Sequence, residues 1–468
     1  MLISNAEIED VTGLDLRIQN GHIQEIGSGI KRQPGEQAWD ADGGSVIPGL
    51  HDHHIHLYAL AAAAASTACG PPDVRTASDL AQALARACRR TRPDGWVRGI
   101  GYHESVAGDL DRHKLDRWTG TTPVRIQHRS GALWVLNSEA MKQLPLTGDI
   151  EKPGIERDAQ GLATGRLFRL DDWLRDHLGP PSPPELKSVG DLLARRGVTG
   201  VTDATPSNDA STLAAFTDAI AKRQLRQRLW IMGRPELPSS NAPGIERSAV
   251  KIMLDDARLP DFDGLRERIE QAHAARRSVA IHCVTRAELV FATEALAAAG
   301  VRDGDRIEHA AVTPPELMQR LSDLSLQVVT QHGFLYPRGD AYARDVEPQD
   351  RPWLYRGRGF LDAGVPLGGG TDAPFGPADP WRCIRDAVAR RTENGQVLEA
   401  PEALSPENAL ALFTTAAEAP GSHPRRVAVG CPADLCVLDR PWSRARSVLS
   451  SDLVAGTICR GEILWRRV

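Results

Sequence analysis

The stretch VIPGLHDHHIHL, residues 46–57, is an apolar run that ends in four histidines and one aspartate. It is the first of eight short apolar or β-branched runs, which alternate with helical patterns. The other seven are VTGVTDA (198–204), RLWIMG (228–233), VKIMLDD (250–256), SVAIHCV (278–284), DRIEHAA (305–311), LQVVTQHG (326–333) and VPLGGGTDA (365–373). This repeated strand–helix alternation predicts an α/β fold, namely a distorted TIM (β/α)8 barrel. A doubly wound parallel sheet is the competing fold, and the number of runs disfavours it.

Both ends of the chain carry short strand patterns. Residues 1–47 include the pair Asn20-Gly21, which favours a tight turn between two strands. Residues 424–468 hold two further strand-like runs around a glycine turn. Chain ends often lie close together, so we expect these segments to pair into one small β-sandwich. The barrel would then comprise residues 48–60 and 186–423.

A long segment separates the first barrel strand from the second. Residues 61–185 far exceed an ordinary loop between a strand and a helix, and they contain strand-like runs of their own. They predict an inserted α/β subdomain, which we expect to lie over the active site at the barrel mouth. Helical patterns are expected elsewhere too, at residues 79–90, 262–277 and 406–419.

The composition excludes several classes of partner. The 468 residues include 56 basic and 61 acidic ones, for a net charge of -5 and no basic stripe, so we expect no nucleic-acid partner. No stretch approaches the length of a membrane span, and the N-terminal residues lack a secretory signal pattern. The seven scattered cysteines indicate a reducing compartment, so we expect a cytoplasmic protein.

Strand geometry divides the histidines of the opening stretch into two sets. Successive side chains of a strand point to opposite sides, so His54 and His56 share one side with Asp52. His51 and His53 share the other side and are expected to be packing residues. Two histidines at i and i+2 at the carboxyl end of a barrel strand can hold one metal ion. Alone, this pair is weak evidence for a site.

Four other predicted strands end in residues that can bind a metal, namely Lys251, His282, His309 and Asp372. Each of them singly is better explained as a core residue or as a lysine that reaches the surface. Barrel enzymes place their working groups at the carboxyl ends of the strands. The joint occurrence of these residues therefore predicts a metal centre.

The order of these residues resembles the amidohydrolase superfamily of metal-dependent hydrolases. Over nearly the whole chain, stretches such as VKIMLDD, RIEHAAV, LWVLNSEAM and GCPADLCVLD look like its amidohydrolase-3 or YtcJ-like branch, which includes N-substituted formamide deformylase. The resemblance implies six metal ligands: His54, His56 and Asp372 at one ion, His282 and His309 at a second, and a carboxylated Lys251 between the two.

Such a set of residues suits hydrolysis of a carbon–nitrogen bond. A divalent ion lowers the pKa of a bound water, and the carbamate of Lys251 would offer two anionic oxygens to the ions. Asp372 could accept the proton of the attacking water and pass it to the leaving nitrogen, with His309 as a second catalytic candidate. We therefore expect a hydrolase of a small-molecule amide or N-formyl compound. One or two zinc ions are expected, and manganese, iron or cobalt would also suit these ligands.

Two other functions stay open at this point. Some members of the superfamily are deaminases, which by resemblance carry a glutamate three residues after the fifth-strand histidine; Thr285 stands there and weakens that alternative. A barrel without catalysis would be expected to have lost ligands, whereas the candidate positions keep side chains that can bind a metal. A homodimer is compatible with the sequence.

Three residues are candidates for contacting the substrate, namely His128 and Trp96 in the insert and His332 after the seventh strand. A strand-end histidine bonded to backbone explains His128 equally well. The insert departs from the branch at Ala132, where a histidine is usual, and near Arg169, where a glutamate often stands. We therefore expect a substrate specificity that differs from that of the branch.

Overall fold

The computed structural model describes residues 1–71, 73–92, 95–145, 152–178 and 184–467. They form two compact units, one of Met1–Leu57 with Glu185–Val468 and one of Tyr58–Pro184. Among the described residues, no helix is long and apolar enough to cross a membrane.

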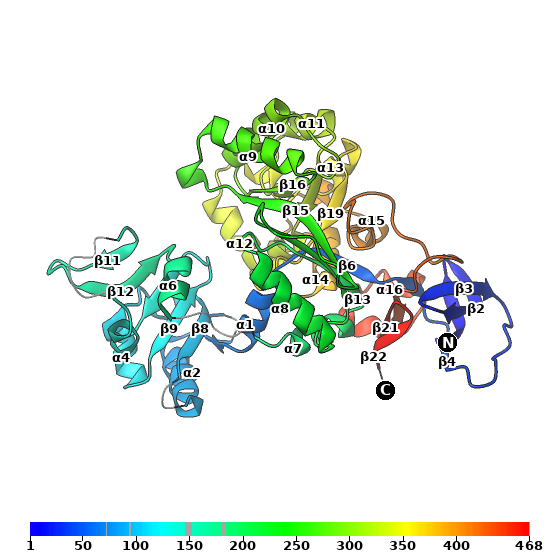
Figure 1. Cartoon of the computed structure of the whole chain (residues 1–468), viewed down its shortest axis with the longest axis horizontal. Coiled ribbons are helices and arrows are strands. Elements are labelled where there is room, and N and C mark those ends of the chain that lie inside the picture. The colour runs from blue at the N-terminus through cyan, green and yellow to red at the C-terminus, as the bar shows by residue number, and fades with distance from the viewer. Residues whose placement is uncertain (72, 93–94, 146–151, 179–183, 468) are drawn as a thin grey trace. The chain divides into compact units, whose positions relative to one another are not determined.

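The first unit is built around a parallel eight-stranded sheet that closes into a barrel (Figure 1). Its strands are β6 (Leu50–Ile55), β13 (Val198–Asp203), β14 (Arg228–Gly233), β15 (Ile245–Met253), β16 (Val279–Cys283), β17 (Arg306–His309), β18 (Gln327–Thr330) and β19 (Leu367–Gly369). Two backbone hydrogen bonds join the segment after β19 to β6: Asp372 N to His54 O at 2.7 Å, and His56 N to Ala373 O at 2.9 Å. The predicted barrel is confirmed, and the doubly wound alternative is wrong.

Helices alternate with the barrel strands, and Figure 1 shows α9, α10 and α11 outside the sheet. The helices of this unit are α7 (Lys187–Arg195), α8 (Ala210–Ala221), α9 (Phe262–Ala274), α10 (Arg286–Ala299), α11 (Pro315–Asp323), α12 (Leu335–Asp345), α13 (Arg358–Asp362), α14 (Pro380–Ala389), α15 (Pro406–Ala411) and α16 (Trp442–Ala445). The helix expected over 406–419 ends at Ala411 instead. The Leu412 and Phe413 carbonyls accept hydrogen bonds from Gly369 N and His51 N at the barrel, so they are not available to continue the helix.

The opening stretch forms two strands rather than one. β5 (Val46–Pro48) pairs with a strand from the C-terminus, and β6 begins the barrel at Leu50. Gly49 lies between them, where a Cβ would stand only 2.3 Å from a Thr199 methyl carbon. This close packing lets the chain pass directly from the terminal sheet into the barrel.

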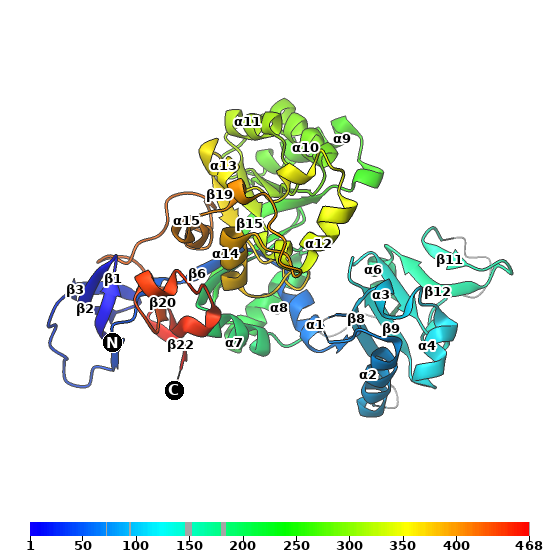
Figure 2. The ribbon, with the colours of Figure 1, turned by 180° about the vertical axis from the view of Figure 1, so that it is seen from behind.

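Both termini build a small β-sandwich, and their strands lie side by side in Figures 1 and 2. One sheet has the order β3-β2-β1-β4 and the other β22-β21-β20-β5. Their strands are β1 (Leu2–Ile8), β2 (Val11–Gln19), β3 (His22–Gly27), β4 (Ala38–Asp40), β20 (Leu435–Leu438), β21 (Val454–Cys459) and β22 (Glu462–Arg466), besides β5. Leu16 and Ile23 share one buried cluster with Leu435 and Ile458, so the predicted pairing of the ends is confirmed. The Asn20-Gly21 turn has φ of 50° and 77°, the left-handed backbone that such a hairpin needs.

The second unit is the insert after the first barrel strand. Its sheet has the order β11-β12-β10-β9-β8-β7. The elements are α1 (Leu57–Ala64), β7 (Thr67–Ala68), α2 (Ala77–Arg90), β8 (Val97–Tyr102), α3 (Glu104–Ala107), α4 (Arg112–Thr119), β9 (Val124–His128), β10 (Leu133–Leu136), α5 (Ser138–Lys142), β11 (Ile155–Arg157), β12 (Ala163–Phe168) and α6 (Asp171–Leu178). One face of the sheet packs on α2 through residues such as Val97, Val124 and Leu84. The insert is confirmed as a compact unit, and its position over the barrel mouth stays a prediction.

Candidate active site

The carboxyl ends of several barrel strands carry the predicted metal ligands. His54 lies in β6 with His56 just after it, Lys251 lies in β15, His282 in β16 and His309 at the end of β17. Asp372 follows β19. Parallel strands of a barrel end at one face, which brings residues from distant parts of the sequence together.

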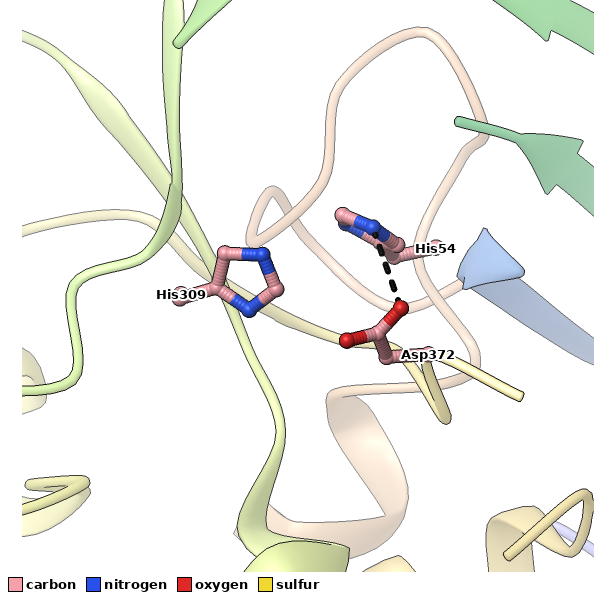
Figure 3. A group of neighbouring side chains, drawn as sticks. All are labelled: His54, His309 and Asp372. Atoms are coloured by element: carbon pink, nitrogen blue, oxygen red, sulfur yellow. Dashed lines mark ion pairs between the residues drawn. The ribbon is translucent and has the colours of Figure 1, made fainter. Parts of the chain in front are cut away.

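Asp372 lies at the middle of this group, close to two histidines. Its Oδ1 is 3.1 Å from Nε2 of His56 and 3.6 Å from Nε2 of His54. His309 completes a cluster in which one ligand atom from each of His54, His309 and Asp372 lies within 4.8 Å of the others (Figure 3). All three side chains are buried. Histidine and carboxylate are ligand types that a transition-metal ion binds, so this group could hold one.

Hydrogen bonds at Nδ1 fix the orientation of the histidine rings. His54 Nδ1 bonds to the Glu308 carboxylate, and His309 Nδ1 bonds to Oε1 of Gln331 at 2.6 Å. Both of these oxygens can only accept, so each Nδ1 donates and each Nε2 keeps its lone pair for a metal. Nδ1 of His56 contacts the Thr205 hydroxyl at 2.9 Å, which leaves its Nε2 toward Asp372.

Glu308 is held by a second buried charge. Nε of Arg306 donates to its carboxylate at 2.6 Å, and both side chains are almost fully buried, at 4% and 0% exposure. Burial would raise the pKa of Glu308, but the charges of Arg306 and Lys251 and the bond to His54 hold that pKa well below its usual value. The carboxylate therefore stays ionised and keeps His54 in one tautomer.

Removal of the Glu308 charge is expected to destabilise the barrel strongly. In the Glu308→Gln variant Arg306 would remain buried without a counter-ion, which costs about 3–5 kcal/mol in the free energy of unfolding. The matched control is Glu294→Gln, because Glu294 forms an exposed pair with Arg320 whose loss costs less than about 1 kcal/mol. Urea unfolding measures both variants. Equal losses in the two would contradict this role of Glu308.

Two of the candidate ligands, His309 and Asp372, have a left-handed backbone conformation that sets the direction of their side chains. His309 has φ of 71° and Asp372 has φ of 52°, a region that residues other than glycine rarely adopt. In a regular strand Glu308 and His309 would point to opposite sides, yet Glu308 bonds to His54 and the His309 ring centroid lies 5.0 Å from that of His54. The departure at His309 thus lets two consecutive residues reach the same ring, as backbone strain at functional sites often does.

His282 packs against His309, and the charge of Lys251 acts on both rings. The His282 and His309 rings meet edge to face at a centroid distance of 4.5 Å. Lys251 is buried, and its Nζ has no hydrogen-bond partner among the described residues. Burial lowers the pKa of Lys251, although the charges of Glu308 and Asp372 act to raise it. Burial and the charge of Lys251 lower the pKa of His282 to about 3. A buried amine without a partner is costly, and its presence needs an explanation beyond packing.

The remaining residues of the opening stretch make structural contacts. Asp52 accepts hydrogen bonds from the Thr371 hydroxyl at 2.5 Å and from its amide at 3.0 Å, so it ties β6 to the segment that carries Asp372. His51 Nε2 bonds to Thr202 and His53 Nε2 to Thr415, at 2.9 and 3.0 Å.

The Asp372 carboxyl is suited to hold a negative charge. Its burial would raise the pKa, but the hydrogen bond with His56 and the charges of His54 and His309 lower it below the usual value. An ionised carboxylate beside three imidazoles can bind a cation or accept a proton.

His332 is buried just after β18, and a substrate role for it stays a prediction. His332 is only 2% exposed. Its Nε2 lies 3.2 Å from the point where a Cβ on Gly357 would stand. Burial and the charge of Arg390 lower its pKa to about 3. The ring is therefore neutral in the folded protein.

This neutral ring predicts a loss of stability in acid. A histidine with a folded pKa of about 3 and an unfolded value of 6.5 favours the unfolded chain as the pH falls below 6.5, by about 2 kcal/mol at pH 5. A His332→Gln variant has no such titrating group. The difference in the free energy of unfolding between the variant and the wild type should therefore shift by about 2 kcal/mol in favour of the variant between pH 7.5 and pH 5. Other titrating groups act equally in both proteins. A difference that stays constant with pH would contradict the prediction.

Two candidate substrate residues lie in the inserted unit. His128 bonds to Ser130 at 2.7 Å and to Glu104 at 3.2 Å, and Trp96 donates to Gln143 at 2.9 Å. These contacts lie within that unit, and a substrate role for either residue stays a prediction.

The two positions at which the insert departs from the branch are neighbours in the structure. The Arg169 amide donates to the Ala132 carbonyl at 2.8 Å, and Arg169 has a positive φ of 52°. The changes at Ala132 and Arg169 therefore belong to one place in the inserted unit.

Thr285 has a structural role. It is the N-cap of α10: its side chain accepts from the Glu288 amide at 3.2 Å, while the Glu288 carboxylate accepts from the Thr285 amide at 3.0 Å. This capping box fixes the start of the helix and offers no acid at that position.

Known proteins resemble this chain in sequence and in fold. A sequence profile of the amidohydrolase family matches residues 37–465. The N-substituted formamide deformylase of Arthrobacter pascens is 26% identical and is aligned over 100% of this chain and 98% of its own. The putative amidohydrolase YtcJ of Bacillus subtilis (strain 168) is 23% identical over 91% of this chain and 90% of its own. An uncharacterized metal-dependent hydrolase of Pyrococcus horikoshii OT3 has the same fold, with a TM-score of 0.76 and 22% identity over 94% of this chain and 97% of that one.

The barrel, its cluster of histidines and the family match together define a hydrolase. The chain belongs to the amidohydrolase family and is an enzyme of that family. The predicted resemblance is confirmed, and the two sequence relatives fall in the branch that the motifs indicated.

Proposed function

We propose that this protein is a metal-dependent hydrolase that cleaves the carbon–nitrogen bond of a small N-formyl or N-acyl compound. The observation that carries the proposal is the anchoring of the His54 and His309 rings at Nδ1, with Asp372 between histidines. Rings anchored in this way keep the Nε2 lone pair available to a metal, as metal-binding histidines do. The name of the Arthrobacter relative supports a formamide-like substrate.

The residues present fit one or two divalent ions. His54, His56 and Asp372 would hold the first, His282 and His309 the second, and a carboxylated Lys251 would bridge them. The lone Nζ of Lys251 supports this arrangement, because burial lowers its pKa and so favours the neutral amine that can react with carbon dioxide. A bound divalent ion supplies Lewis acidity and lowers the pKa of water. Zinc suits histidine and carboxylate ligands, as do manganese, iron and cobalt.

Asp372 then moves the proton. Its ionised carboxylate accepts the proton from the attacking water and delivers it to the nitrogen of the leaving amine. The Asp372 amide donates to the His54 carbonyl at 2.7 Å, so the backbone of Asp372 stays in place through both transfers. His309 is fixed by Gln331, so its part in catalysis would be to hold, through Nε2, the ion that supplies Lewis acidity at the substrate carbonyl.

A deaminase is the second candidate, and Thr285 disfavours it, because that residue caps a helix where the resemblance implies an acid. The seven cysteines are free, which fits the proposed cytoplasmic location. A homodimer remains a prediction.

A product assay separates the two activities. The purified protein is incubated with pairs of N-formyl and N-acetyl amines and with cyclic amidines. Release of a primary amine with formate or acetate supports the proposal. Release of ammonia alone from the amidines would favour deamination and overturn it.

A further inference from the structure

Two arginines lie side by side on one face of the sheet in the inserted unit. Arg98 in β8 and Arg125 in β9 are register partners on parallel strands, which are about 4.8 Å apart. Both guanidinium groups lie over the ring of Trp134, at 5.5 and 5.3 Å from its centroid. Arg125 also lies 5.9 Å from the ring of Trp96.

Neither arginine has an acidic partner within ion-pair distance among the described residues. Arg98 donates only to neutral groups, the Ser66 hydroxyl at 3.2 Å and Oε1 of Gln127 at 3.3 Å. Arg125 has no hydrogen bond in the described part of the chain, and its Nε is buried. This is unusual, because a guanidinium has five donors and a buried donor without an acceptor is costly.

Among the described residues, Asp171 is the one carboxylate whose charge acts on both arginines, and it accepts the Trp134 Nε1 hydrogen bond at 2.8 Å. Two cations thus face one anion, and the group carries a net charge of about +1. Burial lowers the pKa of both guanidinium groups, that of Arg98 to about 10, and the charge of Arg125 lowers the pKa of Arg98 further. Like charges opposite each other on neighbouring strands destabilise a sheet.

Stacking on the indoles gives the arginines some support but no acceptor for their N–H groups. A single oxyanion between them would accept those hydrogen bonds and balance the charge. A carboxylate suits the place better than phosphate, because its one charge matches the net +1 and its two oxygens fit guanidinium donors. The partly exposed indole of Trp96 would contact an apolar or aromatic group attached to it.

We propose that this face of the inserted unit binds an organic carboxylate between Arg98 and Arg125. The proposal is independent of the activity proposed above, since it rests on contacts within the inserted unit alone. It assigns a recognition role to two side chains, of which Arg98 has only neutral acceptors and Arg125 has none among the described residues.

Calorimetric titration of the full chain with benzoate tests the site. Arg125→Met keeps the apolar stem over the indoles and removes the charge, so benzoate should bind at least about tenfold more weakly. Arg117→Met is the matched control, because Arg117 is exposed on α4 in the same unit, and it should bind like the wild type. Benzamide, the neutral analogue, should bind the wild type no better than benzoate binds Arg125→Met. Benzoate bound elsewhere, for example at a metal, remains in all three proteins and cancels.

A second measurement needs no variant. Phenylglyoxal labels arginines, and benzoate should slow labelling of Arg98 and Arg125 in the wild type, as located by peptide mass mapping, without slowing that of Arg117. Equal benzoate affinity in the wild type and Arg125→Met, or no protection of the two arginines, would overturn the site. Tighter binding of inorganic phosphate at the same residues would overturn the assignment to a carboxylate.

Discussion

Asp372→Asn is expected to lower kcat by about 10²–10⁴-fold, the contribution usual for a positioned general base. Asparagine has nearly the same shape and can still lie beside His56, but its amide cannot accept the proton of the attacking water. The carboxylate is ionised in the folded protein, because His56, His54 and His309 outweigh its burial and lower its pKa. The loss should therefore appear at every pH at which the wild type is active.

Steady-state kinetics on the best N-formyl substrate measures this effect, with metal content determined on the same samples. Asp362→Asn is the control, since Asp362 forms an exposed pair with Arg358 on α13 and should leave kcat unchanged. Turnover at the wild-type rate in Asp372→Asn, with normal metal content, would contradict the proposed proton transfer.

Lys251→Met is expected to abolish measurable turnover while it stabilises the metal-free chain. Substitution of a residue that merely supports a ligand costs roughly 10–100-fold, and the loss of a bridging ligand should exceed that. Methionine has a similar length and no polar atom, so it removes a buried amine that has no partner. That change should raise the free energy of unfolding of the chelated protein by about 1–3 kcal/mol.

The two opposite effects distinguish a working lysine from a packing one. Lys142→Met is the control, because the Lys142 side chain is 68% exposed on α5. Growth with ¹³C-bicarbonate gives a direct test of the modification: the wild type should show a carbamate carbon resonance that Lys251→Met lacks. A fully active Lys251→Met protein would sink the bridging role.

Much of the barrel could be predicted, because its strands are buried on both sides and read as short apolar runs between helices. The pair His54 and His56 followed from the two-residue period of a strand. The boundary at Gly49 did not, since β5 and β6 form one continuous apolar run and only the tertiary contact with Thr199 separates them. The helix predicted over 406–419 is too long for a similar reason, because backbone amides of barrel strands bond to the carbonyls that would continue it.

The residues that orient the ligands were missed. Glu308 stands next to His309, and strict alternation along β17 would turn it away from the site. Only the positive φ of His309 allows both to reach His54, and no sequence period signals that departure. Gln331 and Thr205 follow strand ends, and their side chains contact His309 and His56 only because the barrel brings these segments together. Burial and the charge of Arg390 lower the pKa of His332, which position alone does not signal, and its substrate role stays a prediction.

Removal and return of metal test the central claim most directly. The purified protein is treated with a chelator, its metal content is measured, and turnover of the N-formyl substrate is followed while zinc is added back. We predict that the metal-free chain is inactive and that activity returns as the site fills, in the wild type but not in His54→Ala. Undiminished turnover in a preparation with no detectable metal would contradict the account.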